Sequence, residues 1–177
     1  MKRIVFMLLA AVCAFAAPVE AAPPSPIAPP FGLNWGLTKD RLSTLLKGAN
    51  AKVVERRMVA GREAWNVEGL VLAHLRCTVF YFRGEGLDEA ELQYQDKNWL
   101  ENDYNDFLNQ LRTSLDGKFG PGKLIARSKN PLPDGVIQTL TGYEWVQPGN
   151  AVQLVFFSAE NPSEVYRLVS LHYKELK

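Results

Sequence analysis

The sequence predicts an α+β fold made of two similar units, each a helix packed on a four-stranded antiparallel sheet. Three observations lead to this prediction. Residues 97–119 carry apolar side chains at steps of three and four, which is the period of one helical face. Segments with the alternation and composition of β-strands lie on both sides of this helix. The order of one helix and four strands occurs twice, in residues 31–95 and again in residues 96–177.

The first 21 residues have the layout of a secretory signal peptide. Lys2 and Arg3 give a positively charged start, residues 4–17 are almost wholly apolar, and small residues follow. Cleavage is expected after Ala21, and Ala16 offers an earlier site. The apolar run is shorter than the ~20 residues of a spanning helix, so we expect no stable membrane insertion after cleavage. The sequence thus predicts an exported protein, periplasmic or secreted.

The charge and cysteine content narrow the classes of function. The 177-residue chain has a net charge of +1, and removing the leader takes away Lys2, Arg3 and Glu20, which leaves a neutral mature chain. A neutral chain with mixed signs lacks the basic surface that nucleic acids need. Cys13 leaves with the leader, so Cys77 has no partner for an internal disulfide. Stability therefore has to come from one hydrophobic core in residues 31–177.

The first half begins with a proline-rich segment, residues 22–30, which predicts an extended linker between the cleavage site and the domain. Thr38 is placed to cap a short helix that Gly48 ends. Its apolar stripe is Leu42, Leu45 and Leu46. Four strands are expected after it, in residues 52–59, 62–67, 70–83 and 90–95.

The second half follows the same order. The long helix of residues 97–119 has Asn98 as its expected cap and ends before Gly120. Four strands are expected in residues 123–128, 136–146, 151–158 and 165–173. The Trp65-x-x-x-Gly69 spacing of the first half returns as Trp145-x-x-x-Gly149 in the second. This match favours an internal duplication.

The repeated order in a small exported chain resembles the tandem repeat of the β-lactamase inhibitor protein family, and a similar unit occurs in outer-membrane-assembly small lipoproteins. The residues that carry the resemblance are Trp35-Gly36-Leu37-Thr38, the helix end at Leu46–Gly48, and Leu115 with Lys118-Phe119-Gly120-Pro121. The resemblance implies the two-unit fold and protein binding. The chain departs from the inhibitors in having no cysteine pairs, and from the lipoproteins in lacking a lipidation site.

Residues with reactive side chains are few and follow no catalytic pattern. His74 and His172 lack the spacing of a zinc site, and no phosphate-binding glycine loop is present, so the sequence predicts no metal and no cofactor. Cys77 lies in an apolar strand and is expected to be a packing residue. No catalytic residue is assigned. A hydrolase that uses dispersed groups such as His74 and Asp88 is the third candidate function.

Four aromatic residues in the expected strands give the only candidate binding surface: Trp65, Phe82, Tyr143 and Trp145. If the helices cover one face of the sheet, large rings on the other face are good anchors for a partner. A second core or a homodimer contact is the alternative, and the oligomeric state stays open. The predicted function is non-enzymatic binding of a protein partner in the cell envelope. The alternative is binding of a small apolar or glycan ligand in a cleft between the sheets.

Overall fold

The computed structural model describes residues 25–176, so the predicted signal peptide, residues 1–21, lies outside the described residues. Eleven elements follow one another: η1 (Pro30–Gly32), α1 (Lys39–Gly48), β1 (Lys52–Val59), β2 (Arg62–Glu68), β3 (Leu75–Arg83), β4 (Gly86–Tyr94), α2 (Glu101–Phe119), β5 (Lys123–Pro131), β6 (Ile137–Gln147), β7 (Asn150–Glu160) and β8 (Val165–Glu175). The α+β class and the antiparallel strands predicted from the sequence are confirmed.

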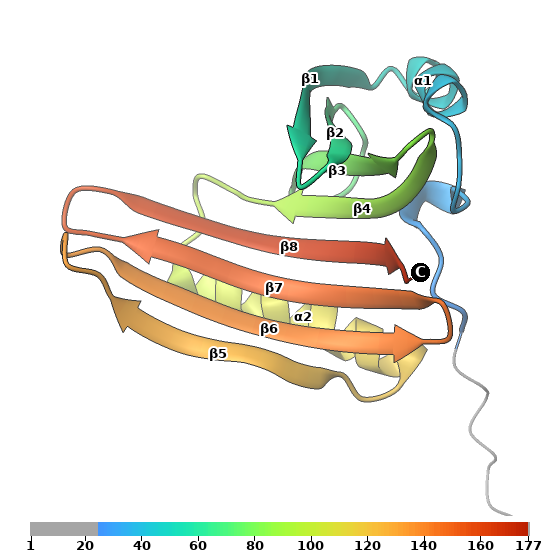
Figure 1. Cartoon of the computed structure of the whole chain (residues 1–177). Helices are drawn as coiled ribbons and strands as arrows, with labels where there is room; N and C mark the ends of the chain where they lie inside the picture. Colours follow the sequence, from blue (N-terminus) through green and yellow to red (C-terminus); the bar gives the residue numbers. More distant parts are fainter. Residues whose placement is uncertain (1–24, 177) are drawn as a thin grey trace, which may run out of the picture.

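The predicted division into two units, each with its own four-stranded sheet, is wrong. All eight strands form one antiparallel sheet in the order β1-β2-β3-β4-β8-β7-β6-β5 (Figure 1). The two runs of four strands join where β4 pairs with β8, from Glu89 opposite Lys174 to Tyr94 opposite Val169. This pairing satisfies backbone groups that two separate sheets would leave unpaired at an edge.

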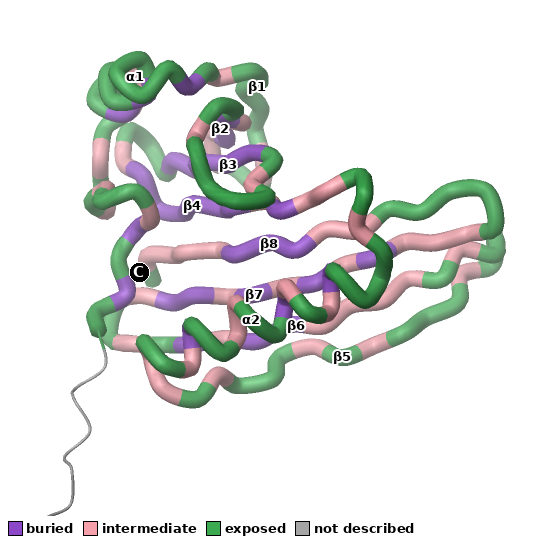
Figure 2. Tube along the Cα trace, turned by 180° about the vertical axis from the view of Figure 1, so that it is seen from behind, coloured by how far each residue is buried: buried purple, intermediate pink, exposed green. Residues whose placement is uncertain are grey.

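Both helices pack on the same face of this sheet. The core under α2 includes Leu92 of β4 and Leu171 of β8, and the core under α1 includes Ala90 of β4. Ala90 and Leu92 are two residues apart on one strand, so their side chains point to the same side. Seen from that side, β4 and β8 run between the two helices (Figure 2). We call this side the helix face and the other side the open face.

Residues 25–30, predicted as part of a linker, are docked on the helix face. The Ser25 N–H donates to the Lys118 carbonyl over 3.0 Å. The side chain of Gln147 accepts from the Ile27 N–H and donates to the Ser25 carbonyl, each over 2.8 Å. The Ile27 side chain is 2% exposed and belongs to the core under α2. This segment is therefore part of the folded domain.

The internal duplication stays a prediction. Trp65 lies on β2 and Trp145 on β6, and each of these is the second strand of its run of four. The two tryptophans also point to the same face, since each contributes to the core beneath a helix. Among the described residues, no helix has the length and apolar character needed to cross a membrane.

Candidate functional site

The aromatic residues predicted to form a binding surface are buried. Trp65 and Trp145 are each 3% exposed, Phe82 is 1% exposed and Tyr143 is 6% exposed. All four belong to the core on the helix face, Trp65 and Phe82 under α1 and the other two under α2. The expectation of an open aromatic surface is therefore wrong, because both helices cover the face to which these rings point.

The hydrogen bonds of the two tryptophans explain why they are held inside. The indole N–H of Trp65 donates to the Glu63 carboxylate over 2.7 Å. That of Trp145 donates to the Gly120 carbonyl over 2.9 Å and to the Asp116 carboxylate over 3.1 Å. Since a buried indole needs a partner for its N–H, these contacts satisfy both residues within the chain.

An apolar groove lies on the helix face between α2 and residues that precede α1. Its volume is about 380 Å³, within the usual range for small-molecule sites. Leu92 and Leu171 form its floor where β4 meets β8, and Leu111 of α2 lines one wall. Phe31, before α1, and Leu72, in the loop before β3, also line it. The lining is: Pro30, Phe31, Leu72, Leu92, Tyr94, Leu111, Ser114, Leu115, Lys118, Leu171 and Tyr173. We call this cavity the α2 groove.

A second apolar cavity, of about 260 Å³, lies beside α1 and is lined by Leu42, Leu45 and Leu46 of that helix together with Phe80 of β3. We call it the α1 pocket. Phe31 lines both cavities. The loop before β3 also serves both, because Leu70 lines the α1 pocket and Leu72 lines the α2 groove.

Exposed apolar side chains lie in the linings of the two cavities or next to a lining residue in the chain. Phe31 is 38% exposed and Leu72 is 43% exposed, while Val71 between the two loop leucines is 94% exposed. Apolar side chains that gather at a cavity mouth are typical of a binding surface. Phe31 also has φ 62° and ψ 22°, the left-handed conformation that residues with a Cβ rarely adopt. Such strained backbone conformations occur often at ligand sites.

Few polar groups line the α2 groove. The phenols of Tyr94 and Tyr173 do so, and burial raises the pKa of each; the neighbouring Tyr173 raises that of Tyr94 further. Both phenols are therefore neutral near pH 7 and able to donate a hydrogen bond to a ligand. Lys118, on the exposed side of α2, is the only charged residue in the lining of either cavity.

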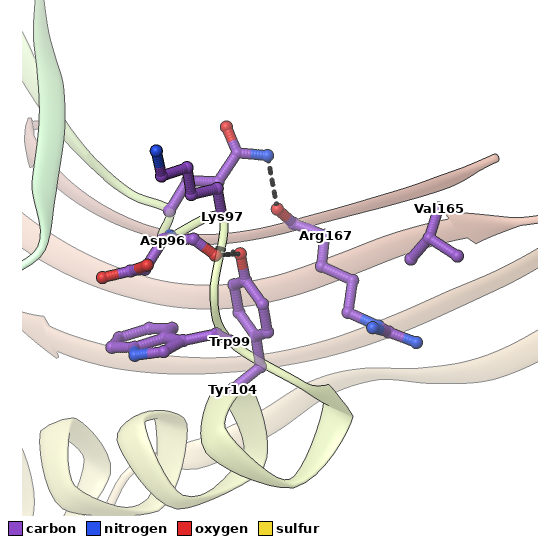
Figure 3. Close-up of a pocket in the computed structure, with 7 residues that line it drawn as sticks. Asp96, Lys97, Trp99, Tyr104, Val165 and Arg167 are labelled. Carbon is purple, nitrogen blue, oxygen red and sulfur yellow. Dashed lines mark hydrogen bonds between the residues drawn. The ribbon is translucent and has the colours of Figure 1, made fainter.

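A polar pocket of about 220 Å³ lies where β4 leads into α2 (Figure 3). Most of its polar groups are already used within the chain. The Tyr104 hydroxyl donates to the Asp96 carbonyl over 3.2 Å, the Gln95 amide donates to the Arg167 carbonyl over 3.0 Å, and the Arg167 guanidinium makes two 2.8 Å bonds to Glu160. This pocket offers a ligand fewer unused groups than the α2 groove does.

The open face carries a hydrogen-bonded group of three side chains that sequence reasoning missed. Ser170 Oγ lies 3.0 Å from Nε2 of His172, and His172 Nδ1 lies 2.9 Å from Oε1 of Glu89. This is the order of groups in a serine hydrolase. However, Ser170 and His172 lie on β8, an inner strand hydrogen-bonded on both sides to β4 and β7. Its backbone N–H groups are used by the sheet, so they cannot form an oxyanion hole beside Ser170.

The same network continues to the first half of the chain. The Glu91 carboxylate accepts bonds of 2.8 Å from both the Tyr81 hydroxyl and the Gln93 amide. The buried thiol of Cys77 donates to the Gln93 carbonyl oxygen over 3.2 Å, and burial raises the pKa of this thiol. The predicted packing role of Cys77 is confirmed. We interpret the whole network as structural, since its groups satisfy one another.

His74 and Asp88, named for the third candidate function, do not meet. His74 lies in the loop before β3 and its ring packs 4.6 Å from that of Trp99. Asp88 lies at the other end of the β3–β4 hairpin and pairs with Arg83 over 3.0 Å. Asp88 and Tyr94 are six steps apart along β4, a span of about 20 Å, and Tyr94 pairs with Leu75 beside His74. General acid–base catalysis by this pair is therefore excluded.

Within residues 25–176, no group of three or more His, Cys, Asp or Glu side chains is arranged to hold a metal ion. Searches of protein-family models, curated proteins and solved structures find no match to this chain. The resemblance to the β-lactamase inhibitor proteins therefore stays a prediction, and the candidate site rests on the geometry of the helix face.

Proposed function

We propose that this chain is an exported, non-enzymatic protein that binds a small apolar ligand in the α2 groove. The observation that carries the proposal is an apolar cavity of about 380 Å³ over the β4–β8 junction, with exposed Phe31 and Leu72 at its mouth. Apolar lining with a few polar groups is the usual character of small-molecule sites. Export is inferred from the leader-like first 21 residues.

The proposal requires one wall of the groove to move. Leu92 and Leu171 on the floor are each only 3% exposed, so the groove is narrow above them. Phe31 and Leu72 are more exposed and lie outside the strands and the two α-helices. Displacing these two side chains widens the groove without breaking the sheet, because few buried contacts hold such segments.

Two tryptophan variants of α2 test the proposal. Ser114 lines the groove and Asn109 does not, and both side chains are exposed on the same helix. We expect Ser114→Trp to fill the groove and Asn109→Trp to leave it open. Binding is measured by titrating the mature protein with a fluorescent naphthalene sulfonate dye and by thermal shift against a panel of apolar compounds.

The expected result is that wild-type protein and Asn109→Trp bind the same compounds, while Ser114→Trp binds them at least tenfold more weakly. Equal binding by the two variants would place the ligand elsewhere, and no binding by the wild type would reject the proposal. A protein partner in the cell envelope stays a prediction. With the aromatic residues buried, it has lost the surface on which it was based.

A further inference from the structure

The α2 groove and the α1 pocket have a lining residue in common. Phe31 lines both cavities, and the loop 70–72 places Leu70 in one and Leu72 in the other. At about 260 Å³, the α1 pocket alone falls below the usual volume of a small-molecule site. The shared residues suggest that the two cavities form one bent channel when the Phe31 ring turns aside.

Charge is confined to one end of this channel. Lys118 stands beside the α2 groove, and none of the nine residues that line the α1 pocket is charged. The polar Ser114 lies one helical turn before Lys118 and also lines the groove. The channel thus has a cationic, polar end at α2 and a wholly uncharged end at α1, which complements a ligand with an anionic head and a long apolar tail.

We propose, given that the α2 groove is the binding site, that its ligand is a long-chain fatty acid. The carboxylate lies at Lys118, the first part of the chain lies over Leu92 and Leu171, and the tail passes Phe31 into the α1 pocket. The path requires the Phe31 side chain to turn aside, and this residue is 38% exposed.

A chain-length series tests the path of the tail. Burying one methylene group contributes about 0.8 kcal/mol, which is about a fourfold gain in affinity. Saturated fatty acids from eight to eighteen carbons are titrated below their micelle concentrations by calorimetry. We expect the gain to continue past the length that fills the α2 groove. In Leu45→Trp, which fills the α1 pocket, the gain should stop at a shorter length while short acids bind as before.

Two further variants keep this test decisive. Ala49→Leu fills the α1 pocket from the end of α1, where the side chain is exposed, and serves if Leu45→Trp fails to fold. Val54→Trp places the same ring on an exposed position of β1, outside both cavities, and should behave as wild type. If the filled and unfilled proteins stop gaining affinity at the same chain length, the tail does not enter the α1 pocket and the proposal is overturned.

The position of the carboxylate is tested with fatty alcohols of equal length. The wild-type protein should bind the acid several-fold more tightly than the alcohol, and Lys118→Gln should lose this difference. Lys47→Gln, an exposed change on α1 outside the lining of both cavities, should keep it. Equal binding of acid and alcohol by the wild type would overturn the assignment of the head. If apolar compounds bind but no fatty acid does, this inference fails while the proposed function stands; if nothing binds, both fail.

Discussion

Glu89 of β4 gives a prediction that can be worked out from its contacts. Its side chain is 7% exposed, and its carboxylate lies 2.6 Å from the Arg62 guanidinium, 2.9 Å from the His172 ring and 3.9 Å from the Lys174 ammonium. Burial by itself would raise the pKa of this carboxyl. The hydrogen bonds from His172 and Arg62 and the charge of Lys174 outweigh burial, and they lower the pKa from 4.5 to about 2.

The lowered pKa of Glu89 determines how the stability of the fold depends on pH. The folded protein holds the Glu89 proton less tightly than the unfolded chain does, so ionised Glu89 stabilises the fold above about pH 4.5. This contribution is lost as the pH falls from about 4.5 toward 2. A lowering from 4.5 to about 2 corresponds to about 3 kcal/mol, a large share of the stability of an ordinary domain.

The perturbation is Glu89→Gln, which keeps the shape of the side chain and removes its charge. At pH 7 we expect the free energy of unfolding in urea to fall by about 3 kcal/mol, because Arg62 and His172 lose a buried anionic partner. Between pH 5 and pH 2.5 the wild-type and variant values should converge. Glu164→Gln, a change at an exposed turn residue, should follow the wild type throughout. Parallel wild-type and Glu89→Gln curves over this range would refute the assignment of the pKa shift.

Two other predictions concern packing. Gly122→Ala should lose about 1–3 kcal/mol of unfolding free energy in a urea titration, since a Cβ there would lie 2.5 Å from two ring atoms of Trp145. Gly117→Ala is the control: a Cβ there would meet no atom within 4 Å, so this variant should gain about 0.5–1 kcal/mol by the same measurement. Ile27→Ala should lose about 2–4 kcal/mol by the same measurement if the docked segment belongs to the core, whereas an unchanged midpoint would mean that it is only a linker.

Much of the secondary structure could be predicted because local signals decide it. Thr38 caps α1 as expected, its hydroxyl accepting from the Arg41 N–H over 3.4 Å, and α1 ends at Gly48. The start of α2 is different. Asn98, the expected cap, donates its N–H to Asp96 within a turn, and the helix begins at Glu101 with the Asp103 carboxylate accepting from the Leu100 N–H. Glu101 lies three residues after Asn98, and Asp103 lies three residues after Leu100. Either carboxylate could complete a cap at that spacing, and the sequence does not show which one does.

The candidate site could not be predicted because it depends on how the two halves meet. The alternation of apolar and polar residues in β4 would be the same at the edge of a sheet and inside one. The paired residues of β4 and β8 are more than seventy positions apart in the chain, so no local pattern shows that these strands meet. The buried Glu89 and Glu91 illustrate the problem. Their alternation with apolar residues indicates a solvent-facing side, yet both are about 5% exposed because polar side chains of β8 and β3 cover them.

The meeting of β4 with β8 also places the α2 groove over the junction of the two runs of strands. Two separate units would each have placed a helix over the middle of its own sheet. In the single sheet α1 and α2 lie apart on the helix face (Figure 2), and the paired Leu92 and Leu171 belong to the core under α2 and also line the α2 groove. Phe31 and Leu72, which lie outside the strands and the two α-helices, line this groove together with residues of α2. On the open face the same strands carry polar groups that satisfy one another, whereas the two apolar cavities lie on the helix face.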